Sequence, residues 1–274
     1  MIDKFDYAEP LCPLSGGKEF YYPDNTKPIG RIDVDRIIKK LDEFFSRNDM
    51  SGAKRLLEFW RGESVSLRDR EGELSIENEL VGLYRKLADK ENGLESVKRA
   101  MELIEITDQS NTATGATVLL NCATALKSFG YPDEAMPLYL KAEEIYKAQL
   151  SPSDPSFGGL YNNMALALAD LGRFEEAEKM YLNALGVMEN VKNGEPECAV
   201  TYINMAHLFE DIGKTEKITE CLFKAYSLLN TEGLPHDGNY AFVCEKCAPS
   251  FAHFGYDFIY NELNTAAREI YERA

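Results

Sequence analysis

The chain has 274 residues, of which 45% are hydrophobic, and it carries 30 Lys and Arg against 46 Asp and Glu, a formal net charge of −16. This apolar content is typical of a folded protein, and the acidic balance excludes nucleic-acid binding through bulk charge, because phosphates are held by clustered Lys and Arg. No apolar run is long enough to span a membrane, and six Cys are too few for a disulfide scaffold, so we expect a reduced, cytoplasmic protein.

Residues 1–30 differ in composition from the rest of the chain. They hold four of the eleven prolines and the aromatic run Phe20, Tyr21 and Tyr22. This composition predicts an extended leader, which we expect to fold back onto the following segment or into its groove. The first six residues contain no apolar core that could serve as a secretory signal.

From residue 31 onward the sequence predicts helices. It is rich in Ala, Leu, Glu and Lys, with apolar residues spaced three and four apart. The segment 151–155 carries the residues of a helix boundary. Pro249 falls inside a predicted helix, and we expect a kink or a late helix start there, because an interior proline removes a backbone hydrogen bond.

Four glycines recur at intervals of 42, 41 and 42 residues, namely Gly130, Gly172, Gly213 and Gly255. Each lies between two amphipathic segments, where a tight turn favours a residue without Cβ. Seven residues before each glycine stand small residues that let two helices approach closely, namely Ala123, Ala165, Ala206 and Ala248. With Asn48 and Ala88 at the two preceding turns, this register gives six units over residues 31–274.

At these positions the chain resembles the tetratricopeptide repeat family. Residues 160–168, followed by residues 172–178 and 181–185, match its pattern best. The period near 42, against about 34 in the common repeat, is similar to the long-helix variety in kinesin light chains. The resemblance implies an all-α fold, a right-handed α-solenoid of about six antiparallel helix pairs, with a leader at 1–30 and the repeat domain at 31–274.

Asparagine recurs two residues before the aligned alanines in the third to fifth units, as Asn121, Asn163 and Asn204. Each amide offers one acceptor oxygen and two N–H donors, enough to bind an extended peptide backbone. In peptide-binding members of the family this position lines the groove, and the resemblance implies the same role here. The alternative interpretation is that these asparagines bridge adjacent helices.

Helical spacing of three and four places further side chains on the same face. The candidate groove residues are Asn162, Thr124, Lys127, Leu166, Asp170 and His207. This lining is mixed polar and apolar with few cations, which argues against a clamp for a terminal carboxylate.

Cys244 and Cys247 form a Cys-x-x-Cys motif, which by itself suggests a redox pair or half of a zinc site. In the repeat register both occupy core positions, and no second pair completes four ligands. We therefore expect the two cysteines to pack in the core, and we expect no metal and no cofactor. The chain has three His and lacks a nucleophile elbow or a phosphate-binding glycine loop, so we expect no enzyme activity.

The sequence therefore predicts a non-enzymatic scaffold that binds an extended peptide segment of a protein partner in its concave groove, and neither nucleic acid nor membrane. One alternative is a regulatory sensor whose superhelix responds to a small signalling peptide. Another is a homo-oligomer, a homodimer through the C-terminal repeat. The homodimer would bury an apolar face at the end of the solenoid against a second copy. The residues of this face are Phe258, Ile259, Leu263 and Ile270.

Overall fold

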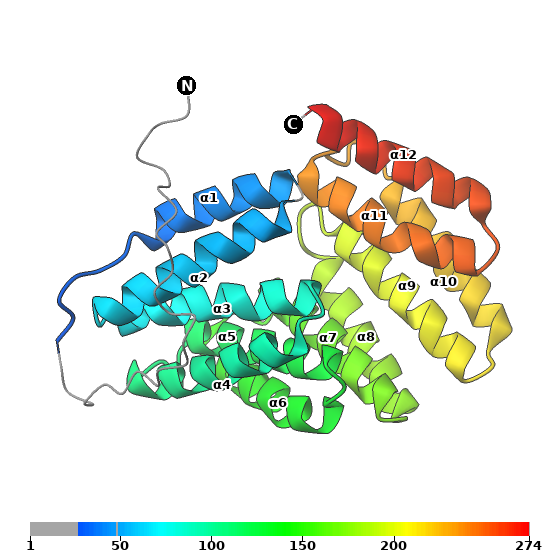
Figure 1. Cartoon of the computed structure of the whole chain (residues 1–274). Helices are drawn as coiled ribbons and strands as arrows, with labels where there is room; N and C mark the ends of the chain where they lie inside the picture. The colour runs from blue at the N-terminus through cyan, green and yellow to red at the C-terminus, as the bar shows by residue number, and fades with distance from the viewer. Residues whose placement is uncertain (1–26, 48, 274) are drawn as a thin grey trace. The chain divides into compact units, whose positions relative to one another are not determined.

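The computed structural model describes residues 27–47 and 49–273, and this part of the chain contains helices and no strand (Figure 1). The leader's aromatic run, Phe20 to Tyr22, lies outside the described residues. The helices are α1 Val34–Ser46, α2 Met50–Ser66, α3 Arg70–Lys86, α4 Lys90–Ile106, α5 Ala113–Ser128, α6 Pro132–Gln149, α7 Ser156–Asp170, α8 Phe174–Met188, α9 Glu195–Asp211, α10 Thr215–Leu229, α11 Gly238–His253 and α12 Asp257–Arg273.

Local sequence explains where the helices begin and turn. Asp33, Asp49, Asp69 and Asp89 cap α1 to α4, and each carboxylate accepts a hydrogen bond from a backbone N–H in the first turn. The four aligned glycines have positive φ angles of 88°, 71°, 68° and 86°, a conformation that glycine adopts without strain. Glycine therefore ends the first helix in each of the last four pairs, as the register predicts.

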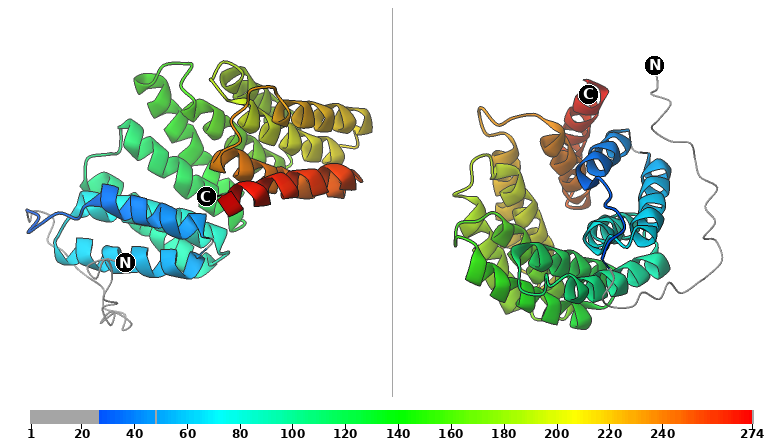
Figure 2. Two further views of the ribbon diagram at one scale, coloured as in Figure 1. Left: turned by 90° about the horizontal axis from the view of Figure 1, so that it is seen from above. Right: turned by 90° about the vertical axis from the view of Figure 1, so that its left-hand side faces the viewer.

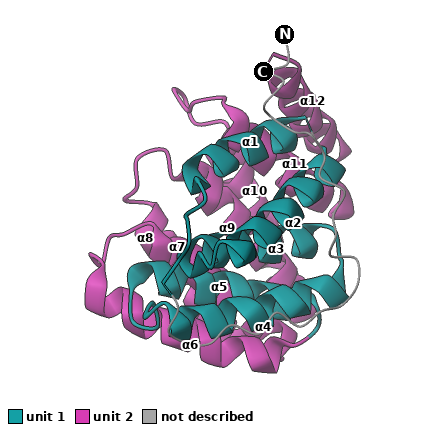
Figure 3. Ribbon diagram, turned by 60° about the vertical axis from the view of Figure 1, so that its left-hand side comes forward, with its two compact units in different colours: residues 1–130 teal, residues 131–274 magenta. Residues whose placement is uncertain are grey.

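The structure divides into two compact units, residues 1–130 and 131–274 (Figure 3). In unit 1, α1 packs on α2, α2 on α3, α3 on α4, and α5 on both α3 and α4. Leu41, Leu57, Leu80 and Tyr84 lie in its core, each 1% exposed or less. The repeat domain predicted as one body over 31–274 stays a prediction.

In unit 2, each helix packs on the next from α6 to α10, and α11 packs on α12. Figure 2 shows α11 and α12 lying side by side as a pair. The first helices of successive pairs also contact each other, because α9 packs against both α7 and α11. The aligned Ala165, Ala206 and Ala248 are fully buried where these helices meet. The predicted fold class, helix pairs packed in succession, is confirmed.

Three detailed expectations have different outcomes. Cys244 and Cys247 are free and buried, at 0% and 1% exposure, so core packing is confirmed. The late helix start at Pro249 is wrong, because α11 begins at Gly238 and runs through the proline. The prediction that Leu263 belongs to an apolar surface at the end of the solenoid is also wrong, because Leu263 is 2% exposed and packs inside unit 2. Phe258, from the same predicted surface, is 78% exposed.

Within the described residues, no helix is long and apolar enough to cross a membrane.

Candidate functional site

Two of the three predicted asparagines bond to an asparagine on a neighbouring first helix. In unit 1, Asn121 Nδ2 on α5 donates to Asn78 Oδ1 on α3 at 2.8 Å. In unit 2, Asn204 Nδ2 on α9 donates to Asn162 Oδ1 on α7 at 3.0 Å. Each bond uses one of the two N–H donors of an amide, so each pair keeps further hydrogen-bonding capacity. The bridging role is therefore present, and the peptide-binding role stays a prediction.

A cavity of about 520 Å³ lies in unit 2 against the first helices α7, α9 and α11. We call it the first-helix cavity. Its lining includes the predicted residues Asn162 and Asn163, side by side on α7, both half-buried. The connection between α8 and α9 closes one side with residues 191–194. A cavity on this face is the feature that a peptide-binding groove requires.

The cavity walls repeat the same helix face three times. Each lining residue can be placed by its distance in sequence from the aligned glycine that follows its helix. Glu197 and Asn239 stand 16 residues before that glycine, Gly159, Val200 and Phe242 stand 13 before it, and Asn163 and Lys246 stand 9 before it. Steps of three and four residues keep side chains on one face of a helix. The cavity therefore follows the register of the repeats.

Gly159 and Phe242 occupy the same register position in the cavity lining. Gly159 lies in the first turn of α7, and a Cβ built there would have no atom within 4 Å, so the backbone is open on this side. Phe242 on α11 is 49% exposed and presents an aromatic surface to the cavity. The charges of the lining come from Lys192, Lys246 and Glu197. Glu197 accepts a hydrogen bond from Asn239 Nδ2 at 3.1 Å.

The other predicted groove residues lie elsewhere. Thr124 and Lys127 are half-buried on α5 in unit 1, and Thr124 Oγ1 donates to the Leu120 carbonyl at 2.8 Å. In unit 2, Leu166, Asp170, Asn204 and His207 are not among the residues that line the first-helix cavity. His207 instead contacts Glu210, Ser250 and His253 near the C-terminal ends of α9 and α11.

Sequence reasoning missed Asn239, Phe242 and Lys192 as lining residues. The repeat register contained the signal for Phe242, because Gly159, Val200 and Phe242 each stand 13 residues before an aligned glycine. Lys192 had no such signal, since it lies in the connection between α8 and α9.

The buried cysteines have the electrostatics of core residues. Burial raises the pKa of the Cys244 thiol to about 11 and that of Cys247 to about 12, because a thiolate is poorly solvated in the core. Both groups therefore stay protonated near neutral pH, which is the state of a structural cysteine and not of a reactive one.

Comparisons with known proteins agree with this architecture. Residues 157–231, which contain α7 to α10 apart from the first residue of α7, match the family model for the tetratricopeptide repeat. No curated protein matches the chain.

Two similar crystal structures are of a Podosopora anserina protein described as a kinesin light chain with nearly identical TPR-like repeats. The first, a form with a single substitution, has 17% sequence identity, covers 72% of this chain and 93% of its own, and superposes with a TM-score of 0.53. The second has 17% identity, covers 72% and 94%, and gives a TM-score of 0.51. Residues 157–231 therefore match the tetratricopeptide repeat, and the fold of the chain is similar to that of kinesin light chain-like repeats.

Proposed function

We propose that this protein is a non-enzymatic interaction scaffold and that the first-helix cavity binds an extended peptide segment of a protein partner. Tetratricopeptide repeats generally mediate protein–protein interaction, and the finer assignment is supported by one observation. Three successive first helices present the same face to a single cavity, and two asparagines adjacent in sequence, Asn162 and Asn163, line it.

The lining suits a peptide backbone with selected side chains. Asn163 carries donors and an acceptor that match the N–H and C=O groups of an extended strand. Phe242, half exposed in the cavity, offers an aromatic contact for one apolar side chain of the ligand. Two lysines and one glutamate line the cavity, so the proposed ligand carries apolar and acidic residues.

Asn121 and Asn204 belong to the same proposal in a different way. Asn204 is bonded to Asn162, and we propose that the bond orients the amide so that its remaining donor faces the ligand. Asn121 is bonded to Asn78 in the same way, and we propose that it presents its remaining donor on the corresponding face of unit 1. We propose that Leu166 and Asp170 contact ligand side chains in unit 2, and that Thr124 and Lys127 have the corresponding role on α5 within unit 1. Cytoplasmic localisation stays a prediction, as does the regulatory sensor.

A random-peptide phage library, selected on the immobilised chain, tests this function. Peptides that bind the native protein should lose affinity by roughly tenfold or more for the double variant Asn163→Ala, Asn204→Ala in unit 2, because each backbone hydrogen bond contributes about 1 kcal/mol. Fluorescence anisotropy of the selected peptides measures the change.

The matched control is Asn183→Ala, which removes an exposed amide from the second helix α8. It should leave peptide affinity unchanged, and circular dichroism should show that both variants keep their helices. Selected peptides that bind the double variant as tightly as the native chain would contradict the assignment of these two asparagines.

A further inference from the structure

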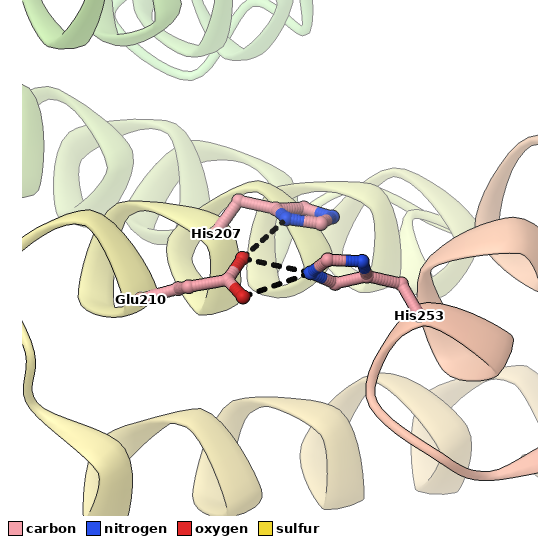
Figure 4. Close-up of side chains that lie close together, drawn as sticks. All are labelled: His207, Glu210 and His253. Carbon is pink, nitrogen blue, oxygen red and sulfur yellow. Dashed lines mark hydrogen bonds and ion pairs between the residues drawn. The ribbon is translucent and has the colours of Figure 1, made fainter.

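Three side chains that can ligate a metal lie together in unit 2 (Figure 4). His207 and Glu210 lie one turn apart on α9, and His253 is the last residue of α11. His253 Nε2 lies 2.8 and 3.0 Å from the two carboxylate oxygens of Glu210, and His207 Nδ1 lies 3.4 Å from Glu210 Oε2. One ligand atom from each residue lies within 4.8 Å of the other two.

Two neighbours fix the imidazole rings. The ring of Phe254 lies 5.0 Å from that of His207 and 4.7 Å from that of His253, measured between centroids. Ser250 Oγ lies 2.9 Å from His207 Nε2. A metal-binding histidine commonly has its second ring nitrogen bonded to such a group, which orients the first nitrogen toward the ion. Here that bond leaves His207 Nδ1 facing Glu210.

The composition of the cluster is unusual for this chain. The sequence contains three histidines, and the fold brings two of them, His207 and His253, to one carboxylate. The Glu210 carboxylate lies within hydrogen-bond distance of both imidazole rings (Figure 4). A cation placed among the three groups gains from the negative charge and from the nitrogen lone pairs.

We propose that His207, Glu210 and His253 form a binding site for a divalent transition-metal ion of the Zn²⁺ class. Two imidazole nitrogens and one carboxylate are a donor set that such ions prefer, and it leaves at least one position to water or an outside ligand. Mg²⁺ and Ca²⁺ prefer oxygen ligands and are not expected to compete. The proposal does not depend on peptide binding in the first-helix cavity.

The observed distances suit this ion after a small adjustment. A tetrahedral ion with bonds of about 2.0–2.1 Å holds its ligand atoms about 3.3 Å apart. The 3.4 Å between His207 Nδ1 and Glu210 Oε2 is already close to this value, and the shorter contact from His253 opens when an ion replaces the bridging proton. The side chains are 41%, 42% and 52% exposed for His207, Glu210 and His253, so the ion has access and the rotamers can adjust.

Titration of the untagged, metal-depleted full chain with Zn²⁺ by isothermal calorimetry tests the proposal. We expect one equivalent to bind and to raise the Tm, because the ion bridges α9 and α11 only in the folded state. Co²⁺ supplies a spectroscopic probe of the same site. Its visible spectrum should show nitrogen and oxygen ligation without a thiolate charge-transfer band.

Variants locate the site. His207→Ala, His253→Ala and Glu210→Gln should each weaken Zn²⁺ binding by roughly tenfold or more. The control His236→Ala changes the third histidine, which stacks on Tyr240 at 4.1 Å, and should leave the affinity unchanged.

Far-UV circular dichroism and the metal-free Tm check that each variant keeps its fold, with His→Gln replacements where an alanine variant does not. Three results would overturn the proposal: no binding of Zn²⁺ or Co²⁺ by the native chain, binding that survives the histidine substitutions, or a thiolate band in the Co²⁺ spectrum.

Discussion

Glu77 on α3 illustrates how a single residue sets the pH response of unit 1. Its carboxyl group is 2% exposed, with Oε1 4.0 Å from Arg61 Nη1 and Oε2 without a hydrogen-bond partner among the described residues. Burial raises its pKa to about 7, and the positive charge of Arg61 only partly opposes this shift. The protonated form is therefore favoured in the folded state.

We predict that Glu77→Gln stabilises the protein above pH 7. In the unfolded chain this carboxyl titrates near its ordinary pKa of 4.5, so between pH 4.5 and 7 unfolding releases a proton and the folded state loses stability as the pH rises. A neutral amide removes this loss, which is on the order of 3 kcal/mol. Urea denaturation of the native chain and the variant at pH 5 and pH 8 measures it.

Glu73→Gln is the matched control on the same helix. Glu73 is 3% exposed, and Arg99 Nε donates to its Oε1 at 2.7 Å, so its substitution should destabilise unit 1 by about 2 kcal/mol at pH 8. If Glu77→Gln also destabilises at pH 8, the account of its burial is wrong.

The residues of the candidate site were predictable only in part. The register predicted that Asn121 and Asn204 lie on the same face of their first helices, but it did not predict their hydrogen-bond partners. Asn78 precedes Asn121 by 43 residues and Asn162 precedes Asn204 by 42, so the partner lies one position off the repeat column. The contact between His207 and His253 is likewise offset, because it depends on side-chain reach across two helices and not on periodicity.

At the scale of the element, helix capping organises unit 1. Asp69 is 3% exposed at the start of α3, where Oδ1 accepts from Gly72 N at 3.1 Å and Oδ2 accepts from Ile32 N at 2.9 Å. A Cβ at Gly72 would lie 2.4 Å from Asp69 Oδ2, so glycine is needed for this close approach. The carboxylate thus caps α3 and also ties down the segment before α1.

We predict that Asp69→Ala destabilises unit 1 by about 2 kcal/mol, because two buried backbone N–H groups lose their acceptor. Asp33→Ala removes an exposed cap that accepts only from Arg36 N at 3.1 Å, and it should cost about 1 kcal/mol or less. Urea midpoints of the two variants provide the comparison. Equal losses would mean that the bond to Ile32 contributes nothing.

The helices were largely predictable from the sequence, even without the capping residues at their N-terminal ends. Apolar spacing and the aligned glycines predicted six pairs because both depend on local sequence. Asp49 and Gly52 repeat the spacing of Asp69 and Gly72, and this Asp-x-x-Gly pattern was an unused signal for helix starts. The passage of α11 through Pro249 shows that tertiary packing can keep a helix that local propensity would end.

At the scale of the whole molecule, the repeat explains both the fold and the candidate site. The net charge of −16 coexists with a first-helix cavity lined by two lysines and one glutamate. The columns of the repeat could predict the helical walls of this cavity. They could not predict the wall formed by residues 191–194, because that connection lies outside the periodic pattern.

The central claim is that a peptide lies in the first-helix cavity of unit 2, and site-specific photo-crosslinking tests it most directly. A photoreactive phenylalanine analogue replaces either Phe242, in the cavity, or Phe223, which is 73% exposed on α10 and does not line it. Each labelled chain is irradiated with a peptide selected on the native protein. The account predicts a crosslink from position 242, lost on adding unlabelled peptide, and none from position 223. A peptide that crosslinks from position 223 and not from position 242 would contradict it.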